Sequence, residues 1–180
     1  MNNFFIETDR LLITEVDKTM AQSLHENSLD VDNRKFDPDE VYETIEDAKK
    51  IIKSILEWYK QERSPLVYPI ILKSGDNIGY VQAIPLGKLS WEIGYHIAKK
   101  YTGNGYAAEA VKAFLPVIIE KLNIDIMFGI ILRENIASRR VIEKCGFVLE
   151  YSGIGLYQGQ HRNICKYSYK LQNATPLNQK

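Results

Sequence analysis

A glycine-rich segment, Thr102-Gly103-Asn104-Gly105-Tyr106-Ala107, lies between a predicted strand and a predicted helix. The first N–H groups of a helix have no partner within it, and the helix dipole is positive there, so such a turn can bind an anion. Glycine also lets the main chain approach a phosphate closely and adopt dihedral angles that a Cβ forbids. The segment therefore predicts a pyrophosphate site, and an ordinary tight turn is an equally good interpretation of this motif alone.

The same glycines fit the dinucleotide pattern G-x-G-x-x-A, which would run from Gly103 to Ala108. Asp125 follows Gly105 at about the 20-residue distance at which that pattern places a ribose-binding acid. However, a dinucleotide fold has a wholly apolar parallel strand directly before the glycines. Here the preceding strand is followed by polar Lys99 and Lys100. A nucleotide-binding protein therefore stays a less favoured alternative.

The elements that must position this turn follow from the hydrophobic pattern. Apolar and β-branched runs predict strands over 10–16, 66–72, 78–84, 90–98, 124–132, 147–151 and 164–171. Apolar residues at three- and four-residue steps predict helices after Asp17, over 41–61, after the glycine turn and over 135–144. We expect 28–39 to be a loop, and Pro116 to kink its helix.

This order of elements predicts an α/β fold with one mixed sheet and helices on both faces. The three strands between residues 66 and 98 are separated by short turns and predict an antiparallel meander. Asn135 is expected to cap the helix that follows it, and Gly146 to end that helix. A single domain is expected over 1–171, with a polar tail over 172–180.

Composition argues against several classes of function. The 180 residues include 23 Lys+Arg and 23 Asp+Glu, and zero net charge gives no general affinity for nucleic acid or anionic membrane. No apolar run is long enough to span a membrane, and no secretory signal is apparent. The two cysteines form no close pair, which predicts a cytoplasmic protein with reduced thiols. The protein is expected to be a monomer or a homodimer. The three histidines have no metal-ligand spacing, so no metal is expected.

Three segments resemble the GNAT superfamily of acetyltransferases, in its RimJ/RimL-like branch. The region from Glu92 to Ala110 resembles the family's cofactor segment, in which Gln or Arg precedes x-x-Gly-x-Gly/Ala. The region from Asn135 to Phe147 resembles the family's next motif, and Glu7 to Ile13 resembles the start of the branch. Each motif is weak alone, but the three occur in the family's order. Domain 1–171 is thus similar to a GNAT-like N-acetyltransferase with the acyl-CoA N-acyltransferase fold.

The resemblance implies that acetyl-CoA is the co-substrate. Its pyrophosphate would bind the amides of Thr102, Gly103, Asn104, Gly105, Tyr106 and Ala107. The backbone near Tyr95 and Ile97 would pair with the pantetheine arm, and Asn135 would also contact the cofactor. This sequence has Lys100 where Gln or Arg is usual and Thr102 where Arg is common, and both keep a hydrogen-bond donor.

Acetyl transfer needs a neutral amine, an oxyanion site and a donor for the leaving thiolate. N–H groups on the strand from Tyr95 to Ile97 would bind the oxyanion. Many family members have a donating Tyr in the slot occupied here by Ile142, so we expect Ser138 to donate to the thiolate instead. The alternative is that Ser138 only supports its helix. Glu92 is the only acid within the central strand and is predicted as the base, or is an ordinary solvated glutamate.

The predicted reaction is transfer of acetyl to a primary amine, either a peptide or protein N-terminal α-amine or a small-molecule amine. A non-catalytic acyl-CoA-binding protein is the alternative. Acids in 28–39 are expected to contact a cationic acceptor, whereas Glu109 is expected to be structural and Asp76 a turn residue. The acceptor is expected near Phe36, Tyr42, Tyr80, Gln82 and Trp91.

Overall fold

The computed structural model describes residues 4–88 and 90–170. Eight strands form one sheet: β1 (Phe5–Glu7), β2 (Leu11–Thr14), β3 (Leu66–Leu72), β4 (Asn77–Leu86), β5 (Ser90–Ile97), β6 (Ile126–Leu132), β7 (Val148–Tyr157) and β8 (Gln160–Lys170). Five α-helices accompany it: α1 (Ala21–Ser28), α2 (Val31–Phe36), α3 (Ile45–Trp58), α4 (Tyr106–Leu122) and α5 (Ile136–Lys144). Short 3₁₀ turns occupy Lys18–Met20, Pro38–Glu40 and Lys99–Tyr101.

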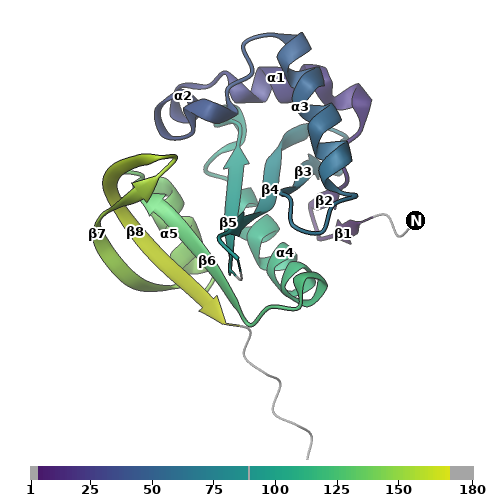
Figure 1. The fold of residues 1–180 in the computed structure, drawn as a ribbon. Helices are drawn as coiled ribbons and strands as arrows, with labels where there is room; N and C mark the ends of the chain where they lie inside the picture. The colour runs from purple at the N-terminus through teal and green to yellow at the C-terminus, as the bar shows by residue number, and fades with distance from the viewer. Residues whose placement is uncertain (1–3, 89, 171–180) are drawn as a thin grey trace, which may run out of the picture.

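The strand order is β1-β2-β3-β4-β5-β6-β8-β7, and only β5 and β6 run parallel. Their pairing is brief, because the register pairs only Trp91 with Met127 and Glu92 with Phe128. Beyond these pairs the two strands diverge, as Figure 1 shows. Antiparallel pairing therefore joins the strands on each side of the centre of the sheet, whereas the two central strands, β5 and β6, are paired over a short stretch only.

Helices cover both faces of the sheet (Figure 1). Helix α4 packs against β2, β4 and β5, and its Val111, Phe114 and Ile118 are fully buried in the main core. Helices α1 and α3 pack on the other face, where Ala48 and Ile52 belong to a second, smaller core. In the part of the chain that the structure describes, no helix has the length and apolarity needed to cross a membrane.

The predicted mixed sheet, the meander and the cap of α5 are confirmed. Asn135 accepts a hydrogen bond from the Ser138 N–H (3.1 Å), and Gly146 follows the helix with a φ of 87°. Helix α4 continues through Pro116, so this proline does not end it. The tail over 172–180 lies outside the described residues, as does Leu171.

Three expectations about the elements are wrong. The segment 28–39 is not a loop, because Asp30 caps helix α2 by accepting from the Asn33 N–H (2.8 Å). The helix expected over 41–61 is shorter, because Thr44 caps it by accepting from the Asp47 N–H. The last two strands are longer than expected and form one hairpin, β7–β8. In addition, the pattern did not predict strand β1.

Gly79 shows how tightly β4 and β5 are paired. Its φ is 154°, and a Cβ there would lie 2.0 Å from the His96 carbonyl oxygen. We expect Gly79→Ala to lower the free energy of unfolding by at least about 2 kcal/mol, since backbone must shift to make room. Urea unfolding followed by circular dichroism measures the loss.

Gly75→Ala is the matched control, because Gly75 also has a positive φ (100°) but has open space around it. That variant should suffer only the backbone strain, about 1–2 kcal/mol. Equal losses in the two variants would contradict the packing argument.

Candidate active site

A cavity of about 330 Å³ lies where β5 and β6 separate. Its floor comes from β4, from β5 just past the last parallel pair, and from Ile130 and Ile131 of β6. Its other walls are the turn after α2, the N-terminal end of α5 and the tip of the β7–β8 hairpin. The cavity thus joins segments that are far apart in the sequence.

Glu92 lies on the cavity wall, and one of its carboxylate oxygens accepts from the Ile130 N–H across the gap between the strands (3.2 Å). Burial raises the pKa of this carboxyl to about 7, against the effect of that hydrogen bond. At neutral pH the group therefore exchanges readily between its acid and base forms, as a general base requires.

A second carboxyl, Glu40, reaches the cavity from the 3₁₀ turn after α2. It accepts hydrogen bonds from the Tyr80 hydroxyl and from Gln82 Nε2 (2.9 Å), both on β4. Gly94 makes this possible, because a Cβ there would lie 2.8 Å from Gln82 Nε2. Burial raises the pKa of Glu40, although its hydrogen bonds oppose the shift.

A third carboxyl, Asp37, joins α2 to the hairpin that roofs the cavity. The Tyr157 hydroxyl donates to Asp37 (2.9 Å) and contacts the Phe36 carbonyl (3.2 Å). Gln158 also donates to Asp37 (3.3 Å). Burial raises the pKa of this carboxyl as well.

The N-terminal end of α5 forms the opposite wall. Ser138 lines the cavity, and no described residue accepts a hydrogen bond from its hydroxyl, whereas the Tyr95 hydroxyl donates to its carbonyl (2.7 Å). Asn135 lines the cavity too and uses its side-chain oxygen as the helix cap. Ile142 is fully buried, and its Cδ1 would lie 2.2 Å from a Cβ at Gly129. The position at which the resemblance would lead one to expect a donating Tyr therefore faces the core here.

Strand β5 leads from this cavity to the glycine turn. Gly103 and Gly105 have φ of 83° and 82°, the left-handed region that favours glycine, and Gly105 directly precedes α4. No described residue accepts a hydrogen bond from the N–H groups of residues 103–107. The Thr102 N–H is different, because it donates to the Lys99 carbonyl (3.2 Å). A role for Thr102 in binding phosphate stays a prediction.

Arg10 holds the glycine turn from the side of β2. It donates to the Asn104 carbonyl (3.0 Å), stacks over the Tyr106 ring at 4.6 Å and pairs with Glu109 (2.5 Å). Glu109 also accepts from the Thr8 hydroxyl (2.6 Å), which agrees with its expected structural role. Side chains from β2 and α4 therefore hold the glycine turn in place.

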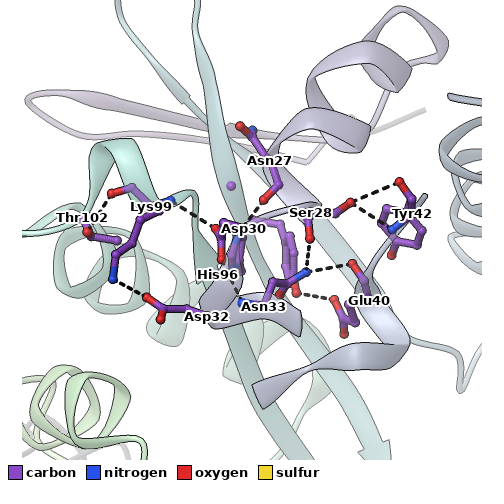
Figure 2. Close-up of polar contacts among 12 residues, drawn as sticks. Asn27, Ser28, Asp30, Asp32, Asn33, Glu40, Tyr42, His96, Lys99 and Thr102 are labelled. Carbon is purple, nitrogen blue, oxygen red and sulfur yellow. Dashed lines mark hydrogen bonds and ion pairs between the residues drawn. The ribbon is translucent and has the colours of Figure 1, made fainter. Parts of the chain in front are cut away.

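Asp30 connects helix α2 to the C-terminal end of β5, as Figure 2 shows. One carboxylate oxygen caps α2, and the other accepts from the Lys99 N–H (3.1 Å) and lies 3.4 Å from His96 Nε2. These contacts lower the pKa of Asp30 to about 2 despite partial burial; the His96 hydrogen bond lowers it most. Asp32 extends the link through an ion pair with Lys99 (2.5 Å).

The structure brings together some of the residues predicted for the acceptor and not others. Tyr80 and Gln82 line the cavity, whereas Trp91 is buried in the core and Tyr42 is not part of the lining. Phe36 lies against a smaller neighbouring pocket instead. Asp76 is a turn residue as expected, since Ser74 donates to it (2.8 Å).

Sequence reasoning missed the three groups that close the cavity: Asp37, Glu40 and Tyr157. The acids of 28–39 are expected to contact the acceptor, but nothing in the sequence shows which of them lines the cavity. The pairing of Tyr157 with Asp37 spans 120 residues of sequence. The one available signal was the alternation of apolar residues before Tyr157, which continues the last-but-one strand farther than predicted.

The sequence and the fold both match known acetyltransferases. A profile of the acetyltransferase (GNAT) domain matches residues 10–148. YnaD of Bacillus subtilis (strain 168), named an uncharacterized N-acetyltransferase, is 32% identical over 143 residues, which cover 78% of this chain and 81% of YnaD. The chain therefore belongs to the GNAT family, and its class of activity is acetyl transfer.

Solved structures agree with this assignment. A GNAT-family acetyltransferase from Bacillus anthracis superposes with a TM-score of 0.78 at 25% identity, covering 93% of this chain and 98% of that one. RimL, a ribosomal L7/L12 α-N-protein acetyltransferase solved with coenzyme A, gives 0.80 at 17% identity, with coverage of 93% and 98%. At 17% identity the second match shows a shared fold alone.

The raised pKa of Glu92 makes protein stability depend on pH. Its folded pKa of about 7 lies above the unfolded value of 4.5, so the stability it contributes is complete below pH 4.5 and is lost as pH rises through 7. We expect Glu92→Gln to gain up to about 3 kcal/mol over wild type between pH 4.5 and pH 8.

Urea unfolding of both proteins across this pH range measures the difference. The other titrating groups are present in both proteins and cancel. A difference between the proteins that stays constant from pH 4.5 to pH 8 would contradict the burial of an ionising Glu92.

Proposed function

We propose that this protein is an acetyl-CoA-dependent N-acetyltransferase that transfers acetyl to a primary amine by direct attack in a ternary complex. The observation that carries the proposal is the cavity at the divergence of β5 and β6, which places Glu92 and Ser138 on its walls. The same strand, β5, leads to a turn with unpaired amides. Membership of the GNAT family limits the chemistry to acetyl transfer.

Coenzyme A binding follows from two sets of backbone groups. The amides of residues 103–107 and the N-terminus of α4 bind the pyrophosphate. The Ala98 N–H donates to Ile78 on β4 (2.9 Å), so by strand alternation the N–H groups of Tyr95 and Ile97 face the β6 side, where β5 has no pairing partner. These groups pair with the pantetheine arm and stabilise the oxyanion. The coenzyme complex of RimL supports the same cofactor.

The chemistry then uses the two side chains on the cavity walls. Glu92, directly or through a water, removes a proton from the ammonium form of the acceptor. The neutral amine attacks the thioester carbonyl carbon, forming the C–N bond. Collapse of the tetrahedral intermediate breaks the C–S bond, and the second proton of the attacking nitrogen passes to the departing thiolate, to which the Ser138 hydroxyl donates a hydrogen bond.

The acceptor is either an N-terminal α-amine or a small-molecule amine. The α-amine loses its proton more easily, with a pKa of about 8 against about 10.4 for lysine. The RimL likeness supports placement in the RimJ/RimL-like branch. The two buried free cysteines, Cys145 and Cys165, support a cytoplasmic, reducing location.

A second candidate is a non-catalytic acyl-CoA-binding protein on the same fold. Ile142 favours it, because a buried isoleucine cannot donate to a thiolate. The free hydroxyl of Ser138 on the cavity wall favours the enzyme.

Cofactor binding is tested by calorimetric titration of acetyl-CoA, beside NAD, into wild type and Gly105→Glu. We expect micromolar binding of acetyl-CoA by wild type and none by the variant, because a carboxylate then occupies the phosphate position. Gly75→Glu is the control, since it places the same side chain at another positive-φ glycine with open space. Tighter binding of NAD, or no binding by wild type, would overturn the proposal.

The role of Ser138 is tested by Ser138→Ala. We expect kcat to fall roughly 100-fold while the affinity for acetyl-CoA is unchanged, since the donor acts only on the leaving thiolate. Release of coenzyme A thiol in the presence of a panel of primary amines measures turnover, and Ser74→Ala, at a distant turn, is the control. Unchanged turnover in Ser138→Ala would leave the Ser138 hydroxyl with no part in the reaction.

A further inference from the structure

The cavity is strongly acidic. Asp37 and Glu40 reach it from the turn after α2 and Glu92 reaches it from β5, and none of its lining residues is Lys, Arg or His. Other acids of the same region, such as Asp30 and Asp32, are paired with His96 or Lys99 outside the cavity. Among the described residues, the three carboxyls that line the cavity form no ion pair, although His96 lies near enough to Asp37 and Glu40 to oppose the rise in their pKa.

These carboxyls are incompletely satisfied by the protein. Glu92 is partly buried on the cavity wall, and only one of its oxygens accepts a hydrogen bond from a described residue, the Ile130 N–H. Glu40 and Asp37 are hydrogen-bonded by neutral hydroxyl and amide groups alone. Burying charge without a partner of opposite sign is costly, and burial raises the pKa of all three groups. A bound cation would supply the missing partner.

The acids are separated along the sheet. The register places Glu92 opposite Ile84 and Gln82 opposite Gly94, so Glu92 and the Gln82 side chain that binds Glu40 are diagonal neighbours. Such neighbours are roughly 7–8 Å apart. The cavity thus presents one carboxyl at the divergence of the strands and a second negative region farther along β4.

Apolar residues also line the cavity, two of which, Ile93 and Ile131, belong to the main core. Six aliphatic residues belong to the lining: Ile84, Leu86, Ile93, Ile130, Ile131 and Leu156. The volume of about 330 Å³ suits a small molecule, and the contact of Tyr157 with Asp37 roofs the cavity. Methylene groups are complementary to such walls.

We propose that the acceptor is a small aliphatic diamine, whose distal ammonium binds at Glu40 and Asp37 while its other amine lies beside Glu92. This inference rests on the proposed function and adds the class of acceptor. The reacting amine gives one proton to Glu92, forms the N–C bond with the acetyl group and gives its second proton to the thiolate as the C–S bond breaks. The distal ammonium keeps its charge throughout.

The test compares 1,4-diaminobutane and 1,5-diaminopentane with 1-aminobutane and 1-aminopentane, which lack the distal charge. A peptide with a free N-terminal serine is included as a third kind of acceptor. We expect kcat/KM for each diamine to exceed that for the monoamine of equal length by at least about tenfold. A ratio near one, or a preference for the peptide, would overturn the inference while leaving the N-acetyltransferase function intact.

Charge-removing variants locate the effect. Glu40→Gln and Asp37→Asn keep the size of each side chain, and each should lower the diamine-to-monoamine ratio about tenfold. Asp39→Asn removes the same charge from the same turn, but Asp39 is exposed and does not line this cavity, so its ratio should equal that of wild type. Because a ratio is internal to each protein, partial misfolding does not change it.

The outcomes also separate the two proposals. Acetyl-CoA binding without transfer to any amine would refute the enzyme rather than the acceptor class alone. A ratio that falls equally in Asp39→Asn would show that overall charge, and not the cavity, selects the acceptor.

Discussion

The separation of β5 from β6 is the constraint on which the rest of the structure depends. After two parallel pairs, the backbone of β5 has no strand on its β6 side, and unsatisfied buried N–H groups cost about 1–3 kcal/mol each. Side chains hold the strands apart: Glu92 binds the Ile130 N–H from within the gap, and Tyr95 anchors the start of α5. The β6 side of β5 is thereby left without a strand partner, as the proposed binding of the pantetheine arm requires. The cavity and the glycine turn lie at the two ends of this unpaired edge.

Local signals made much of this site predictable from the sequence. The glycine turn, the cap at Asn135 and the position of Glu92 in its strand all depend on neighbouring residues, because dihedral angles, capping and alternation act over a few positions. The hydrogen bonding of the Thr102 amide was less predictable. Its N–H closes a 3₁₀ turn onto Lys99, a local hydrogen bond that sequence pattern alone does not distinguish from a free donor.

The residues that α2 and the following turn bring to the cavity could not be predicted in the same way. Helix α2 has six residues and is held largely by tertiary contacts: its Asn33 donates to the carbonyls of Ser28 and Glu40, and Asp30 meets His96 from β5. No local periodicity reports such contacts. Likewise, Glu40 becomes a cavity residue only because Gly94 leaves room for Gln82 to bind it. The chemistry of the acceptor is therefore encoded by pairs that are distant in sequence.

Asp30 joins two segments that lie on different sides of the site. Its carboxylate caps helix α2, which precedes the turn on the cavity wall, and it also binds the Lys99 amide at the start of the 3₁₀ turn that leads to the glycines (Figure 2). Linkage between two binding sites is reciprocal. Any factor by which coenzyme A changed the affinity for the acceptor would therefore equal the factor by which the acceptor changed the affinity for coenzyme A.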